Sequence, residues 1–257
     1  MKRVLPYIGT PIAVLVILAA WQGYVTASGI SPLILPAPAA VFRALLALLA
    51  RPDTYAQAAV TLAEAVGGFV IALFVGVTLG ILFGKIRWLE RALQPVIVAI
   101  QVVPKIALVP LFIVWFGFGM GSKVVIAAVL AFLPIMSNTI LGVKSIERGH
   151  QEVMATLGAG RLPRLLLLEL PSALPYVLTG MEVGIILAMI GAVVGEFLAG
   201  TAGMGHMAVA ALNGFEVDAL FAVIILLAVL GAVTYLAVVL LRRALTGWHA
   251  ASQSPGL

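Results

Sequence analysis

Long apolar stretches without charged residues dominate the chain and predict helices that cross a membrane. A helix needs about 20 mainly apolar residues to cross the roughly 30 Å hydrocarbon layer of a bilayer. Residues 65–84, 124–143 and 219–241 contain no Asp, Glu, Lys or Arg. The pattern predicts an all-α integral membrane protein with about six transmembrane helices. These spans fall at about residues 7–26, 62–84, 92–116, 124–143, 174–198 and 219–241.

Composition excludes a water-soluble globule and most metal or thiol chemistry. Of the 257 residues, 63% are hydrophobic and 10% are charged, and the mean hydropathy is +1.20, whereas soluble domains are nearer half apolar and a quarter charged. There is no cysteine, and the three histidines, His150, His206 and His249, are too far apart for an H-E-x-x-H zinc helix. The net charge of +5 comes without a long basic run, so nucleic acid is not an expected partner.

The distribution of Lys and Arg predicts that both termini are cytoplasmic, because cytoplasmic loops carry an excess of basic residues. This orientation leaves three basic residues in the outer connections, Arg43, Arg51 and Lys123. The cytoplasmic side then receives Lys2, Arg3, Lys85, Arg87, Arg91, Lys144, Arg148, Arg161, Arg164, Arg242 and Arg243. An alternative is that the first span is a signal peptide with a cleavage site near residues 25–27. One membrane domain is expected over residues 1–249, followed by a disordered tail at 250–257.

Two outer connections are expected to stay close to the protein. Residues 28–58 contain four prolines and are predicted to lie along the outer interface, with an amphipathic segment at Ala39–Leu49. Residues 200–215 are rich in Gly, Ala and Met, and they are predicted to fold back into the protein. Glu196, just before this segment, is expected to orient it by accepting backbone N–H bonds, with a gate role as the alternative. Glu64 is expected to be an interfacial charge.

The longest cytoplasmic connection, residues 144–171, predicts a helix, a tight turn and a second helix. Its sequence is K-S-I-E-R-G-H-Q-E-V-M-A-T-L-G-A-G-R-L-P-R-L-L-L-L-E-L-P. The first helix is expected from Ile146 to Leu157, with a stop at residues 158–160 and a restart after Pro163. Composition alone would make this segment an ordinary basic linker.

The spacing of four residues in this connection resembles a known motif. Glu152, Gly158, Leu170 and Pro171 reproduce the E-A-A-x-x-x-G-x(9)-I-x-L-P loop of membrane subunits of ATP-binding cassette (ABC) importers. The chain departs from the motif at positions 153 and 154, where Val and Met replace alanines, and at position 168, where Leu replaces isoleucine. The resemblance extends to the nitrate/sulfonate/taurine-type permeases through segments at 35–41, 101–111, 115–119, 132–139, 170–175 and 203–205.

The resemblance implies a type I ABC importer permease, a multi-pass protein of the bacterial cytoplasmic (inner) membrane. Its implied partners are a second permease copy, two ABC ATPase subunits and an extracytoplasmic solute-binding protein. The implied solute is a small organic or inorganic anion such as a sulfonate, taurine or nitrate. The chain is not expected to be an enzyme or to hold a cofactor, because ATP and Mg would bind the partner ATPase and no G-x-x-x-x-G-K-[ST] sequence is present.

The resemblance also implies that the 144–171 loop supplies a coupling helix, which sits in a groove of the ATPase. Glu152, Ala155 and Gly158 are the expected coupling centre, followed by Leu170 and Pro171. Glu152 is expected to accept a hydrogen bond or pair with a basic ATPase residue. The small side chain of Ala155 would let the partner surface approach closely.

Three charges predicted to lie within spans, Lys105, Glu182 and Glu196, are candidates for the translocation path, because a charge in a membrane is costly unless paired or hydrated. Lys105 and Glu182 would either pair, or Lys105 would satisfy carbonyls freed by Pro104 or meet a passing anion. A rival function follows from the same residues, a self-sufficient ion- or proton-coupled carrier or channel. The small residues Gly76, Gly80 and Gly84 predict close helix packing within the subunit, with a dimer seam as the alternative.

Overall fold

The computed structural model describes residues 5–246, and its side chains from residue 12 onward apart from those of Arg87 and Arg148. Within this range the chain is helical and has no strand. The predicted tail at 250–257 lies outside the described residues. The helices are α1 (Leu5–Ser28), α2 (Pro38–Leu49), α3 (Pro52–Lys85), α4 (Arg87–Val102), α5 (Val109–Phe116), α6 (Met120–Lys144), α7 (Arg148–Thr156), α8 (Arg161–Arg164), α9 (Leu170–Ala199), α10 (Met204–Asn213) and α11 (Val217–Leu245).

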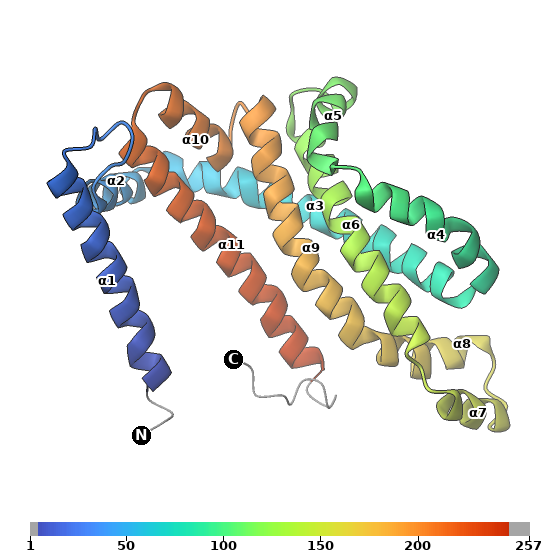
Figure 1. Ribbon diagram of the computed structural model, residues 1–257. Coiled ribbons are helices and arrows are strands. Elements are labelled where there is room, and N and C mark those ends of the chain that lie inside the picture. The colour runs from blue at the N-terminus through green and yellow to red at the C-terminus, as the bar shows by residue number, and fades with distance from the viewer. Residues whose placement is uncertain (1–4, 247–257) are drawn as a thin grey trace.

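Within the described residues, four segments are each long and apolar enough to cross a membrane: α3, α6, α11 and the continuous segment Arg161–Ala199. They contain four of the predicted spans, which confirms those predictions. The first predicted span lies within α1. Figure 1 shows α1, α11, α9 and α6 running in a similar direction and α3 passing behind α9 and α6, with α7 and α8 at the lower end and α2 and α10 at the upper end.

The predicted span at 92–116 is broken into two legs that together are long and apolar enough to cross a membrane. The chain forms α4, a 3₁₀ turn at Lys105–Leu108 and α5, and the two legs are bent by 81°. Pro104 explains the break, since proline has no N–H to donate and disfavours helical geometry in the residue before it. Val103 is accordingly extended, with φ −64° and ψ 125°.

Helices α3, α6 and α9 form the core, and glycines of α3 bring its backbone against α6. A Cβ atom added to Gly80 would lie 2.5 Å from Cβ of Thr139, and one added to Gly84 would lie 2.8 Å from Cβ of Val143. Both contacts are too short for any larger residue. The predicted small-residue ridge therefore packs within the subunit, as expected when dispersion and close fit drive helix association in lipid.

The upper connections follow the predicted pattern. Helix α2 matches the amphipathic segment at 39–49 to within one residue and buries Val41 and Leu48. Helix α10 folds back onto α9 and α11 (Figure 1) and buries Met204, Gly205 and Ala208. The re-entry of residues 200–215 is therefore confirmed.

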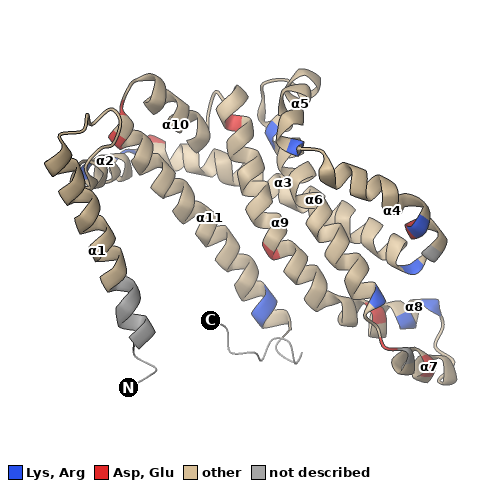
Figure 2. Ribbon diagram, in the orientation of Figure 1, with Lys and Arg blue, Asp and Glu red and all other residues tan. Residues whose placement is uncertain are grey.

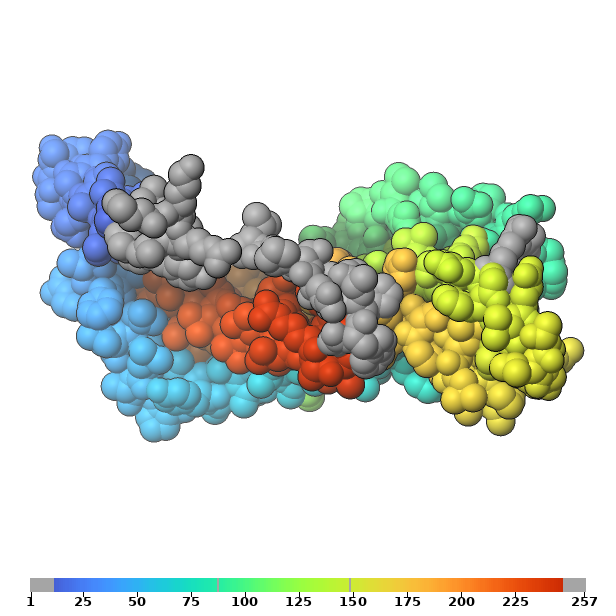
Figure 3. Space-filling view, turned by 90° about the horizontal axis from the view of Figure 1, so that it is seen from below, coloured from blue at the N-terminus to red at the C-terminus, as the bar shows by residue number. Residues whose placement is uncertain are grey.

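Basic residues mark the lower end of the bundle. Lys85 and Lys144 are the last residues of α3 and α6, and Arg242 and Arg243 lie in the last turn of α11. Figure 2 shows these helix ends, together with α8, as basic positions on the lower side. Seen from below, the α7–α8 region forms one end of an elongated face and α1 the other (Figure 3).

Candidate functional site

The hairpin of α7 and α8 turns on Gly158. The N–H of Gly158 donates to the carbonyl of Ala155 at 3.0 Å, and the N–H of Ala159 donates to the carbonyl of Met154 at 3.0 Å. These two bonds form a Schellman motif, which closes a helix with a residue in the left-handed region. Gly158 has φ +68°, a conformation that costs glycine little. The predicted stop at Gly158 is confirmed.

The second arm of the hairpin runs into α9 without a break. Helix α8 begins at Arg161, two residues before Pro163, earlier than the predicted restart. A π-helical turn over Leu165–Glu169 then joins it to α9, and the N–H of Leu170 donates to the carbonyl of Leu165. Pro171 accounts for the wide turn, because it lacks an N–H and its ring would collide with the carbonyl four residues earlier. Leu170 and Pro171 thus lie at the junction between hairpin and span.

The outer surface of α7 is free to meet a partner. Glu152 and Ala155 are exposed, and so are the neighbouring apolar side chains of Val153 and Leu157. Within the described residues, Glu152 forms no ion pair. Exposed apolar side chains grouped around a charge are typical of a docking surface. The role of Glu152 and Ala155 in coupling stays a prediction.

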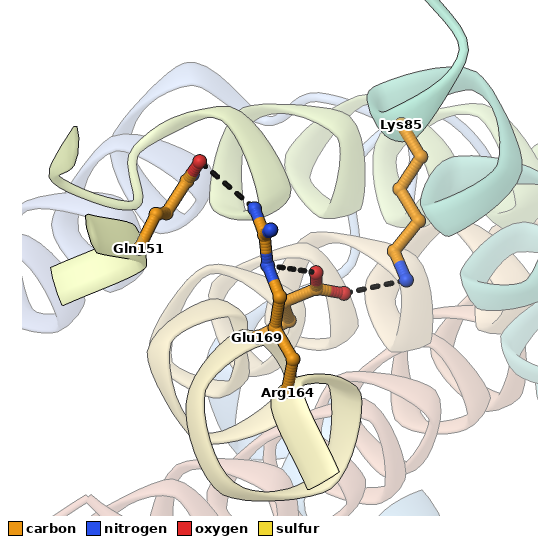
Figure 4. A network of polar contacts seen from close by, with 4 residues as sticks. All are labelled: Lys85, Gln151, Arg164 and Glu169. Atoms are coloured by element: carbon orange, nitrogen blue, oxygen red, sulfur yellow. Dashed lines mark hydrogen bonds and ion pairs between the residues drawn. The ribbon is translucent and has the colours of Figure 1, made fainter. Parts of the chain in front are cut away.

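A polar network joins the hairpin to the end of α3 (Figure 4). Arg164 donates to Oε1 of Gln151 at 2.9 Å, and its Nε lies 3.4 Å from Oε1 of Glu169. The other carboxylate oxygen of Glu169 lies 2.5 Å from Nζ of Lys85. Glu169 therefore bridges a cation of the hairpin and a cation of α3. Sequence reasoning missed this network; the lone acidic residue in the L-L-L-L-E-L-P run was the signal that could have found it.

At the upper end, Glu196 anchors the re-entrant segment. It is 1% exposed. Its Oε2 accepts the N–H of Gly205 at 2.6 Å, and its Oε1 accepts the hydroxyl of Thr61 at 2.7 Å. Thr61 in turn accepts the N–H of Met204 at 2.8 Å. The prediction that Glu196 orients this segment through backbone N–H groups is confirmed.

The same cluster requires a glycine and includes a second carboxyl group. Gly203 has φ +99°, and a Cβ atom there would lie 2.0 Å from Oε1 of Glu196. The N–H of Gly203 donates to Oε1 of Gln57 at 2.6 Å. Glu64, expected at the interface, is instead 3% exposed and interacts with Glu196. The interfacial expectation for Glu64 is wrong because α9 and the re-entrant segment cover this part of α3.

Lys123 is a second buried charge that the sequence placed in an exposed connection. The structure buries it at the start of α6, where its ammonium group donates to the carbonyls of Phe118, of Gly119 at 3.1 Å and of Ala199 at 2.9 Å. These acceptors include the last residue of α9. Lys123 therefore links the upper end of α6 to the upper end of α9 by hydrogen bonds.

The three path candidates do not gather at one site. Glu182 pairs with Arg242 of α11, with Nε 2.7 Å from Oε1, so the alternative of a Lys105–Glu182 pair is wrong. The bend after α4 moves Lys105 to the first residue of the 3₁₀ turn. There it is partly buried and lines an apolar cavity of about 200 Å³ between α3 and α6. Glu196 belongs to the α10 anchor.

The chain is similar to known transport proteins. A family model described as "Binding-protein-dependent transport system inner membrane component" matches residues 76–247. The chain is 40% identical to the riboflavin transport system permease protein of Chloroflexus aurantiacus, over 95% of this chain and 91% of that one. It is 37% identical to the formylaminopyrimidine transport permease protein of Halalkalibacterium halodurans (71% and 73% covered) and 33% identical to the taurine transport system permease protein of Escherichia coli (91% and 87%).

The fold also matches a solved structure. An inward-facing form of the MetNI methionine ABC transporter aligns with a TM-score of 0.61 at 23% identity, covering 77% of this chain and 96% of that one. This likeness supports the type I importer permease fold. Together with the apolar spans, the family match indicates a multi-pass protein of the bacterial inner membrane. The chain therefore belongs to the family of binding-protein-dependent transport system inner membrane components.

Proposed function

We propose that the chain is the permease subunit of an ATP-driven importer. Two copies would form the path, two ABC ATPase subunits would bind the α7 hairpins, and an extracytoplasmic binding protein would deliver the solute. The observation that carries this proposal is the hairpin itself: the exposed helix α7 ends at a left-handed glycine, and the second arm, α8, is continuous with a membrane span. A self-sufficient carrier or channel would have no use for such a hairpin.

The proposal requires that the lower face of the bundle is cytoplasmic. The ends of α3, α6 and α11 carry Lys85, Lys144, Arg242 and Arg243 on that face, as expected from the excess of basic residues in cytoplasmic loops. The hairpin lies on the same side (Figure 1). A cytoplasmic ATPase would therefore find α7 within reach.

The mechanism is alternating access driven from the hairpin. ATP and Mg would bind the ATPase subunits, and closure of that pair would bring the two α7 helices toward each other. Each α7 would pull on α9 through α8 and the π-helical turn, and on α3 through Glu169 and Lys85. The bundle would open outward, accept solute, and return inward after hydrolysis.

The solute we propose is a small heteroaromatic compound of the flavin or pyrimidine type. This proposal is supported by the relatives named for riboflavin and formylaminopyrimidine transport, at 40% and 37% identity. The small anions suggested by the sequence remain the competitor, supported by the 33% identity to the taurine permease. Uptake of labelled riboflavin in competition with taurine by cells expressing the complete transporter distinguishes the two.

The test of coupling uses the full chain with its ATPase partner in proteoliposomes. Gly158→Val places a β-branched residue at φ +68°, where such residues are strongly disfavoured. We expect ATP-driven uptake to fall at least tenfold while the complex still assembles. Gly160→Val is the matched control, because Gly160 has the ordinary backbone angles φ −64° and ψ 177°. Equal uptake by both variants, or uptake without any ATPase, would overturn the proposal.

A further inference from the structure

A polar cavity of about 610 Å³ opens at the lower end of the bundle, next to the hairpin. Its wall combines the ends of α3 and α6, the start of α4 and parts of α7, α8 and the π-helical turn. Figure 4 shows one part of this wall, where Arg164 and Lys85 flank Glu169. The charged lining residues are Lys85, Glu90, Arg91, Lys144, Arg164 and Glu169.

The cavity presents positive charge. Four cations against two carboxylates leave an excess of two positive charges in the lining. The carboxylates lie deep, with side chains 13% exposed for Glu169 and 20% for Glu90, whereas Lys85, Arg164 and Lys144 are 37%, 38% and 42% exposed. A ligand that enters would therefore meet the cations first.

Arg91 is the cation of the lining whose charge is least compensated by the protein. Its side chain is exposed, and within the described part of the chain it belongs to no ion pair. The other three cations already contact Glu90 or Glu169. An anion in the cavity would therefore gain a full partner in Arg91 at little cost to existing contacts.

The position of the cavity points to a lipid. Spans α3 and α6 end at its wall, which sets it at the level of the phospholipid headgroups. Trp88 precedes the lining residue Glu90 by two positions in the first turn of α4 and is 72% exposed, and tryptophan is enriched at membrane interfaces. Leu82, one turn before the end of α3, is also exposed. An acyl chain would therefore find apolar surface beside the basic rim.

We propose that this cavity binds the headgroup phosphate of an anionic phospholipid of the inner leaflet, of the phosphatidylglycerol or cardiolipin class. The cytoplasmic leaflet carries negative lipids, and basic pockets between membrane helices hold their headgroups. The proposal rests on the cytoplasmic orientation of the lower face given above. A bound phosphate would share the cavity with Arg164 and Glu169, so its occupancy would also steady the hairpin.

The test titrates the purified full-length chain in detergent with short-chain phosphatidylglycerol and follows its thermal stability. Phosphatidylcholine of the same chain length and inorganic phosphate are the two comparison ligands. We expect phosphatidylglycerol to raise the melting temperature well beyond the effect of either. Arg91→Gln should weaken the apparent affinity about fivefold, the effect of one basic residue near an anionic surface. Arg51→Gln, an exposed basic residue outside the cavity, should leave the affinity unchanged.

Three results would overturn the proposal. If phosphatidylcholine raised the melting temperature as much as phosphatidylglycerol, binding would depend on the acyl chains alone. If inorganic phosphate raised the melting temperature as much as the lipid, the cavity would be a site for a soluble anion. If Arg91→Gln and Arg51→Gln had the same apparent affinity for phosphatidylglycerol, the lipid would bind at another surface. None of these measurements uses ATPase or solute, so failure here leaves the transport assignment standing, and the uptake experiments test that assignment separately.

Discussion

The bridging carboxylate of Glu169 offers a sharp test of how the hairpin acts on the bundle. Glu169→Gln removes the negative charge that Lys85 and Arg164 share while keeping the size of the side chain. Both cations are more than one third exposed, so solvent screening limits each ion pair to at most about 1 kcal/mol. The free energy of unfolding should fall by about 1 kcal/mol, and the melting temperature by a few degrees.

The effect on coupling should be larger than this loss of stability. Without the Lys85 contact, α3 loses the direct polar link to the hairpin that Figure 4 shows. We expect the variant transporter to hydrolyse ATP at close to the normal rate but to import several-fold less solute per ATP. The assay measures both rates in the same proteoliposomes.

The chain supplies a matched control for this prediction. Glu182 pairs with Arg242, and the side-chain exposures of that pair, 13% and 37%, equal those of Glu169 and Lys85. Glu182→Gln should cost similar stability but should leave the number of solute molecules imported per ATP unchanged, because this pair does not touch the hairpin. If the two variants change that number equally, or if Glu169→Gln leaves it intact, the reasoning about the network is refuted.

Other contacts give further expectations. Gly80→Ala adds a Cβ atom 2.5 Å from Thr139 and should cost about 1–3 kcal/mol of stability. On the same helix, a Cβ atom at Gly67 would meet its nearest neighbour at 3.5 Å, so Gly67→Ala should be tolerated. Thermal unfolding compares the two variants. Thr61→Val removes the acceptor of the Met204 N–H, so amide hydrogen exchange in α10 should rise by about tenfold. Pro171→Ala restores an N–H at the π-helical turn and should straighten it, which spectroscopic distances between α7 and α9 would detect.

Local signals in the sequence were enough to predict the hairpin and the re-entrant segment. Gly158 and Pro171 act on the backbone within a few residues, so their spacing fixes where the helix stops and where it joins the span. Glu196 precedes a run of small residues, and the hydrogen bond that it accepts from Gly205 spans only nine residues of sequence. The four long spans follow from apolar length alone.

The features that could not be predicted from the sequence depend on tertiary packing. Pro104 marks a break, but the 81° bend depends on how α4 and α5 pack around it. The partners of Glu169 and Glu182 lie 84 and 60 residues away in sequence, at Lys85 and Arg242. No local pattern selects such partners. The burial of Lys123 likewise depends on the carbonyl at the end of α9.

The architecture of α9 suggests how a signal from the hairpin would reach the opposite face. Its 30 residues span about 45 Å at 1.5 Å per residue. One end continues into the hairpin through the π-helical turn, and the other end carries Glu196, which holds the backbone of α10. A helix resists bending and stretching far more than a loop does, so a displacement at Leu170 would arrive at Glu196 largely intact. In the proposed transporter, movement of α7 would therefore shift α10 at the opposite end of α9.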